Sequence, residues 1–287
     1  MPLIAFGLTL IVFWIILYGD ELFYFMKLLY LFFLLTSITT SLNAQERNLK
    51  LIDSLTLQAD RFWGVDVYDR FYFSERNVFY KTENKQKFQF QDLQLGDLES
   101  VDLLNPLKIL LFYKEANTIV ILDNRLNEIS RINFGVISDF KTVDFVGVSK
   151  DNSLWIFNAD IQQLELFDYQ NELTQNTSLP INLEILHFKS NYNFCWLQHS
   201  NSFTKYNITG SVVDRFSMEG AISFATFKSQ VMVQTQSSLE LFEKDSRQRT
   251  SFKKPKITFN QFYFNAQNLY ICSDKVLYTY RLTAVNN

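Results

Sequence analysis

Three aspartates in similar sequence contexts are the first candidates for chemistry. Each follows a valine and precedes an apolar residue, and the three are Asp66, Asp102 and Asp144. Carboxylate oxygens are the ligands that hard cations prefer, so three of them facing one axis could bind a cation or a basic ligand group. The alternative is a structural role, in which each carboxylate accepts backbone hydrogen bonds from its own or a neighbouring segment. We favour the structural role, because later positions in comparable surroundings carry no carboxylate: Leu186, Phe224 and Gln261.

Other residue types that commonly support catalysis lack the companions they need. Neither His187 nor His199 has a partner at a spacing such as His-x-x-x-His or Cys-x-x-Cys, and no Gly-x-Ser-x-Gly motif occurs. A chain with only 8 glycines also offers no Gly-rich phosphate loop. The formal net charge of −3 is too small to favour nucleic acid as a partner. We therefore predict no metal, no cofactor and no enzymatic activity.

The elements that must position these residues are short strands. The composition favours them, with 29 Phe and 14 Tyr against 8 Gly and 4 Pro in 287 residues. The pattern repeats every ~36 to 45 residues, the range of propeller blades. The clearest copy covers residues 140–182, with strands predicted at 143–148, 154–158, 164–168 and 173–179. The third strand of each copy ends in an aromatic residue or Leu followed by a polar residue, at Tyr80-Lys81, Leu122-Asp123, Phe167-Asp168, Tyr206-Asn207, Phe242-Glu243 and Tyr280-Arg281.

These copies resemble the β-propeller superfamily, including its divergent six-bladed and YVTN-like members. The resemblance implies one all-β domain over residues 45–287, built from six four-stranded antiparallel blades. The last copy supplies only three strands, and residues 48–57 alternate as an unassigned strand that would close the ring by completing it. A two-sheet sandwich or an open meander with accidental spacing is the alternative. Cys195 and Cys272 would lie in non-adjacent blades, and we expect both thiols to be free and buried.

The N-terminal segment predicts export. Residues 26–44 have the order of a signal peptide, with Met26-Lys27, an apolar run and an Asn43-Ala44-Gln45 ending that resembles secretory signals of Bacteroidetes-type bacteria. Residues 1–25 contain a further apolar run of 16 residues, Leu3 to Tyr18, which is short against the ~20 needed to span a bilayer. We interpret residues 1–25 as a mis-assigned start, with a short apolar helix that anchors the chain to the membrane as the alternative. The predicted location is the periplasm, the cell envelope or the exterior.

The predicted function is a non-catalytic, extracytoplasmic interaction or ligand-binding propeller. Its partner would be a protein or a small ligand, with the chain itself a monomer and the membrane involved only if residues 1–25 are retained. In propellers the turns between second and third strands share one rim with the connections between blades, and here they hold Glu75, Asn117, Asp160, His199 and Asp274. Two alternatives stay open: a channel-centred hydrolase or lyase that uses Asp66, Asp102 and Asp144, and a membrane-tethered scaffold. A carboxylate-lined pocket on the axis would favour the enzyme, and an exposed apolar loop face would favour the interaction module.

Overall fold

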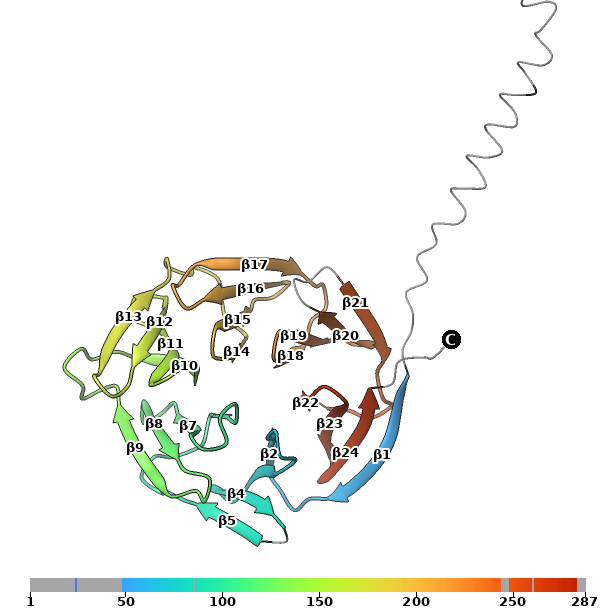
Figure 1. The fold of residues 1–287 in the computed structure, drawn as a ribbon, viewed down its shortest axis with the longest axis horizontal. Helices are drawn as coiled ribbons and strands as arrows, with labels where there is room; N and C mark the ends of the chain where they lie inside the picture. Colours follow the sequence, from blue (N-terminus) through green and yellow to red (C-terminus); the bar gives the residue numbers. More distant parts are fainter. Residues whose placement is uncertain (1–23, 25–47, 85, 244–247, 260, 283–287) are drawn as a thin grey trace, which may run out of the picture. The chain divides into compact units, whose positions relative to one another are not determined.

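Six antiparallel sheets of four strands each make up the fold. The computed structural model describes residue 24 and residues 48–84, 86–243, 248–259 and 261–282. Figure 1 shows the sheets as blades that follow one another in chain order around a central axis. Each blade begins with a strand at the axis and ends with a strand at the periphery. The prediction of a six-bladed propeller is confirmed, and the sandwich alternative is wrong.

The strands of blades 1 to 3 are β2 (Arg61–Val65), β3 (Phe71–Glu75), β4 (Val78–Glu83), β5 (Gln86–Phe90), β6 (Ser100–Asp102), β7 (Ile109–Tyr113), β8 (Thr118–Leu122), β9 (Glu128–Asn133), β10 (Val143–Val148), β11 (Ser153–Asn158), β12 (Gln163–Asp168) and β13 (Leu173–Thr177). Those of blades 4 to 6 are β14 (His187–Ser190), β15 (Phe194–Gln198), β16 (Ser202–Asn207), β17 (Val212–Ser217), β18 (Ser223–Phe227), β19 (Gln230–Gln234), β20 (Ser238–Glu243), β21 (Gln248–Lys253), β22 (Phe262–Phe264), β23 (Asn268–Ser273), β24 (Val276–Leu282) and β1 (Leu49–Thr56).

The ring closes where the two ends of the domain meet. Strand β1 pairs antiparallel with β24, from Leu49 opposite Leu282 to Thr56 opposite Val276, so the sheet order of blade 6 is β1-β24-β23-β22. The N-terminal strand thereby covers an edge that would otherwise expose unpaired backbone groups. The predicted closure is confirmed. The six residue pairs that end the predicted third strands, from Tyr80-Lys81 to Tyr280-Arg281, lie in or directly after β4, β8, β12, β16, β20 and β24.

The core consists of hydrophobic clusters between neighbouring blades. Among the described residues there are six such clusters, and each joins side chains of two adjacent blades. The middle strands β7 and β8 are buried along their whole lengths, whereas the outer strand β13 is mostly exposed. Blade stacking therefore explains why the inner strands are continuously apolar and the outer strands are not. Cys195 is buried and Cys272 is half-buried, and both thiols are free.

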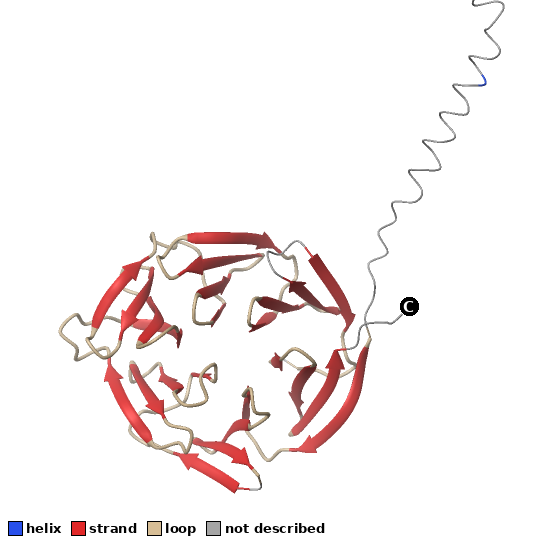
Figure 2. Cartoon of the chain, in the orientation of Figure 1, coloured by secondary structure: helices blue, strands red, loops and turns tan. Residues whose placement is uncertain are grey.

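The antiparallel order of the strands divides the loops between two faces of the ring. Turns from second to third strands and connections between blades lie on one face, which we call the linker face. Turns from first to second and from third to fourth strands lie on the other, which we call the opposite face. Figure 2 shows the strands as the body of the ring and the loops joining their ends.

The predicted signal segment and apolar anchor lie outside the described residues, apart from Tyr24, which is helical. The described residues from 48 onward belong to one compact unit, which contains the ring. In the described part of the chain, no helix has the length and apolar character needed to cross a membrane.

Candidate functional site

Asp66 stabilises a turn of its own blade. It directly follows β2, is buried, and one of its oxygens accepts hydrogen bonds from the backbone N–H groups of Tyr68 and Arg70 at 2.8 and 3.1 Å. The other oxygen accepts from the Tyr72 hydroxyl at 3.0 Å. Burial, together with the nearby charge of Asp66 and this hydrogen bond, raises the pKa of Tyr72. These contacts engage both carboxylate oxygens locally.

Asp102 joins two blades. It is the last residue of β6, and it accepts hydrogen bonds from the N–H groups of Leu104 at 2.9 Å and of Val148, the last residue of β10, at 2.8 Å. Lys189, on β14 of blade 4, lies close enough to interact with it electrostatically. Burial raises the pKa of Asp102 and lowers the pKa of Lys189, and the opposite charge of each partly offsets the shift of the other. Asp102 is thus an inter-blade latch beside a lysine.

Asp144 lies near the other end of the channel. It is the second residue of β10, where the pairing with β11 shifts register, and its carboxylate pairs with Lys114 of blade 2 at 2.7 Å. Val148 is four positions further along β10, ~13 Å away. The structure therefore does not bring Asp66, Asp102 and Asp144 together. The similar sequence contexts correspond to different places in the fold, because β6 ends at Asp102 whereas β10 begins one residue before Asp144.

No metal site emerges from this arrangement. Within the described residues, no three His, Cys, Asp or Glu side chains come close enough to hold a metal ion together. The carboxylates near the channel are matched instead with backbone N–H groups and lysines. Their geometry supports the structural role.

Polar turn residues on the linker face clamp the connections between blades. The Asn117 amide donates to the Lys141 carbonyl at 2.8 Å and accepts from the Val143 N–H at 3.1 Å. The Asp160 carboxylate accepts from the Thr142 N–H at 2.7 Å. Each of these residues lies in the turn where the sequence placed it, and its main contact is with the adjacent connection.

Exposed apolar side chains gather on this face over blade 3. We call this set the blade-3 sector, and its members, 40% to 83% exposed, are Val136, Phe140, Ile161, Leu179, Leu183 and Leu186. They come from the connection 134–142, the turn 159–162 and the connection 178–186. The turn is hydrogen-bonded to both connections, through Ala159 N–H to Thr142 O and Ile181 N–H to Gln162 O, each at 2.8 Å. The three segments are therefore neighbours on the linker face.

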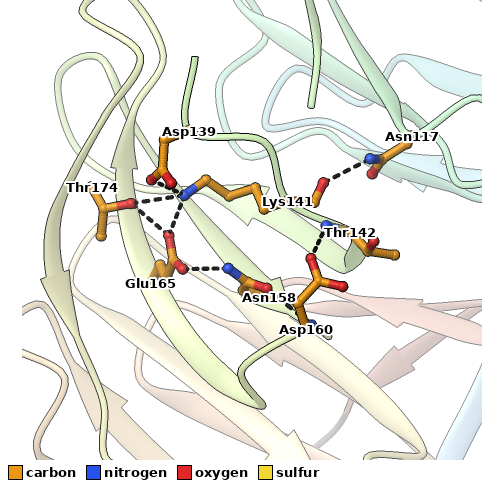
Figure 3. Close-up of polar contacts among 8 residues, drawn as sticks. All are labelled: Asn117, Asp139, Lys141, Thr142, Asn158, Asp160, Glu165 and Thr174. Atoms are coloured by element: carbon orange, nitrogen blue, oxygen red, sulfur yellow. Dashed lines mark hydrogen bonds and ion pairs between the residues drawn. The ribbon is translucent and has the colours of Figure 1, made fainter. Parts of the chain in front are cut away.

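A buried ion pair supports the sector from below. The Lys141 ammonium lies 3.2 Å from the Glu165 carboxylate, 2.7 Å from Asp139 and 3.3 Å from the Thr174 hydroxyl (Figure 3). Glu165 also accepts from the Asn158 amide at 2.8 Å and the Thr174 hydroxyl at 2.6 Å. Lys141 and Glu165 are each 2% exposed. Asp139 and Lys141, the residues on either side of Phe140, both belong to this network, and the Phe140 side chain between them is 63% exposed.

Three exposed carboxylates lie on the segments of the blade-3 sector, and a cavity lies beside it. Asp139, Asp160 and Glu184 are exposed on the same three segments, and the one cation of these segments, Lys141, is buried. Beside Leu183 lies a hollow of about 460 Å³, lined in part by Phe203, Phe216, Tyr206 and Arg215. The sector is thus apolar, acidic at its margins and adjacent to an open cavity.

Sequence reasoning missed the blade-3 sector. Its signal is the unusual density of Leu and Ile in the connection 178–186, which is more apolar than a solvent-exposed loop needs to be. The sequence interpretation instead extended the preceding strand to Leu179, whereas β13 ends at Thr177 and Leu179 is 83% exposed.

Comparisons with known proteins identify the fold and no family. No family model matches the chain, and no curated protein matches it. The β-propeller domain of Cps50 (Swd1) from Myceliophteria thermophila is 8% identical, with a TM-score of 0.59 over 82% of this chain and all (100%) of that one. A chain of the mitotic checkpoint complex is 10% identical, with a TM-score of 0.57 over 84% and 94% of the two chains. Virginiamycin B lyase from Staphylococcus aureus is 7% identical, with a TM-score of 0.54 over 85% and 97%. At these identities the similarity shows the propeller fold alone.

Proposed function

We propose that this protein is a non-catalytic interaction module that binds a protein partner through the blade-3 sector of its linker face. The observation that carries the proposal is the gathering of six exposed apolar side chains on three hydrogen-bonded segments. Exposed apolar side chains on neighbouring segments are costly in water and commonly mark an interaction site. The buried Lys141–Glu165 pair supports a rigid surface, which lowers the entropy cost of binding.

The chemistry of the surface specifies the partner. Apolar side chains of the partner would cover Phe140 and Leu183, and one of them would enter the adjacent hollow. Lys or Arg side chains would meet Asp139, Asp160 and Glu184 at the margin, where complementary charge favours association and orientation. The partner is therefore a protein segment with apolar residues flanked by basic ones.

The geometry offers no support for the hydrolase or lyase alternative. Asp66 and Asp102 are occupied by backbone N–H groups, and Asp144 is ion-paired with Lys114. One of the similar structures is a lyase and another belongs to the mitotic checkpoint complex, so the fold by itself does not choose between activities. An extracytoplasmic location is a further part of the proposal, and mass spectrometry of the mature N-terminus tests it.

Selection from a displayed random peptide library tests the proposed surface. We expect enriched peptides to combine apolar residues with Lys or Arg, and to lose about tenfold or more in affinity for a Phe140→Asp/Leu183→Asp variant. The matched control is Val67→Asp/Leu107→Asp, which changes two equally exposed apolar residues on the opposite face. Binding that is unchanged in the first variant, or lost equally in both, would overturn the proposal.

A further inference from the structure

A second cavity lies on the opposite face, between blades 2 and 3. Its volume of about 410 Å³ falls in the ~300–1,000 Å³ range of small-molecule sites. Apolar side chains from the ends of four strands line it: Leu110, Ile121, Val148 and Leu154. The polar side chains that line it include those of Lys108, Tyr169 and Tyr192. The cavity thus pairs an apolar lining with a few defined polar groups.

Lys108 brings a positive charge that no carboxylate of the described residues neutralises. Its ammonium donates to the Asn152 side-chain oxygen at 3.2 Å and the Tyr169 hydroxyl at 3.3 Å, both neutral groups of the next blade. Across the described residues, no carboxylate oxygen forms an ion pair with Lys108. Lys150 and Asp151 also line the cavity, are both exposed, and offset each other. The remaining charge of the lining is therefore positive.

Tyr192 forms a wall whose position is set by blade 3. Its backbone carbonyl accepts a hydrogen bond from the buried Ser149 hydroxyl at 3.0 Å, and the neighbouring Asn191 carbonyl accepts from the Trp155 indole N–H at 3.1 Å. The side chain itself is 40% exposed. Two cross-blade hydrogen bonds therefore fix the backbone that carries this aromatic ring, which favours a preformed site.

We propose that this cavity binds a small organic anion, with a carboxylate at Lys108 and Tyr169 and an apolar body over Leu110, Ile121 and Leu154. An ammonium that donates to a carboxylate makes a stronger hydrogen bond than it makes to neutral acceptors. The apolar lining removes the ligand body from water and so adds affinity. This inference is independent of the blade-3 sector, which lies on the other face.

Titration of the full ring with benzoate, benzamide and benzylamine, followed by NMR, tests this inference. The three probes share a benzene ring and differ in charge. We expect benzoate to bind at least about tenfold more tightly than benzamide, and the difference in affinity between benzoate and benzylamine to be larger still. Benzoate should also shift the resonances of Lys108 and Tyr169. Lys108→Met should remove the preference for benzoate and leave benzamide binding unchanged. Tyr192→Ala should weaken both benzoate and benzamide, because it removes a wall without removing charge.

Lys114→Met is the matched control, because it removes an exposed lysine from the linker face and should leave all three titrations unchanged. Equal binding of benzoate and benzamide would overturn the inference. An unaltered benzoate affinity in Lys108→Met, or no binding of any probe, would overturn it as well.

Discussion

The two faces of the ring differ in the length of their loops and in where their exposed apolar side chains lie. On the linker face, long connections such as 134–142 and 178–186 carry both buried anchors and exposed apolar residues. On the opposite face, the described turns between first and second strands carry exposed large apolar side chains in three blades, at Val67, Tyr68, Leu107 and Tyr192. A long connection can bury one side chain and still present others, whereas a tight turn has room for little beyond its own hydrogen bonds. The difference explains why the exposed apolar residues cluster on the long connections of the linker face, although each face has a cavity.

The largest effect is expected from breaking the ion pair below the blade-3 sector. Lys141→Met leaves the buried Glu165 carboxylate without its cation, and we expect a loss of ~3–5 kcal/mol in the free energy of unfolding. Urea denaturation measures it. The matched change Lys114→Met removes the exposed pair with Asp144 and should cost ~0–1 kcal/mol. Similar losses in the two variants would contradict the supporting role of the Lys141 network.

Anchor residues of the same connections should also matter for stability. Ile181 is 6% exposed and packs in the cluster between blades 3 and 4. Ile181→Ala removes buried apolar volume and should cost ~2–5 kcal/mol. Thermal or urea unfolding measures the loss, and a cost near zero would mean that the connection 178–186 is not pinned to the core.

The pH dependence of stability should have opposite signs at two aspartates. On the linker face, a hydrogen bond from the Gln94 N–H, aided by Arg131, lowers the pKa of Asp92. Its stabilisation is present above the unfolded-state pKa of ~3.9 and is lost as the pH falls through the lowered pKa. Burial raises the pKa of Asp102. The stabilisation by Asp102 is complete at pH values below the unfolded-state pKa of ~3.9 and is lost as the pH rises through the raised pKa of the folded state.

Unfolding of Asp92→Asn and Asp102→Asn at neutral and acid pH separates the two cases. The loss in the free energy of unfolding caused by Asp92→Asn should be smaller at acid pH than at neutral pH. The loss caused by Asp102→Asn should be larger at acid pH. The same trend in both variants would show that burial does not govern Asp102.

The smallest effect is expected at an exposed member of the blade-3 sector. Leu179 is 83% exposed, so Leu179→Ser should change the free energy of unfolding by less than ~0.5 kcal/mol. Leu179 is two residues from Ile181. A small stability loss in Leu179→Ser beside a large one in Ile181→Ala would show that Leu179 belongs to the exposed surface and Ile181 to the core. A large loss of stability in Leu179→Ser would mean that this side chain packs in the fold.

Blade number and ring closure could be predicted from the sequence because both depend on local periodicity. The repeated third strand is set by which side chains face a neighbouring blade. In β1, Leu49 packs against the cluster between blades 5 and 6, whereas Leu51 is 49% exposed, so the closing strand is marked by its pairing with β24. The positions of Asp102 and Asp144 could not be predicted, because a three-residue strand and a register shift leave no clear mark in the sequence. The blade-3 sector was missed for a related reason. Leu179 and Ile181 look alike in the sequence, and only the path of the connection decides which of them is buried.

The most direct test of the interaction module is photo-crosslinking in the cells that produce the protein. A photoreactive phenylalanine analogue would replace Phe140 on the linker face in one variant and Leu107 on the opposite face in another, two side chains with the same exposure of 63%. We predict a discrete crosslinked protein from position 140 and none from position 107. Crosslinking from position 107 alone, or from neither position, would contradict the proposal that this ring binds its partner through the blade-3 sector.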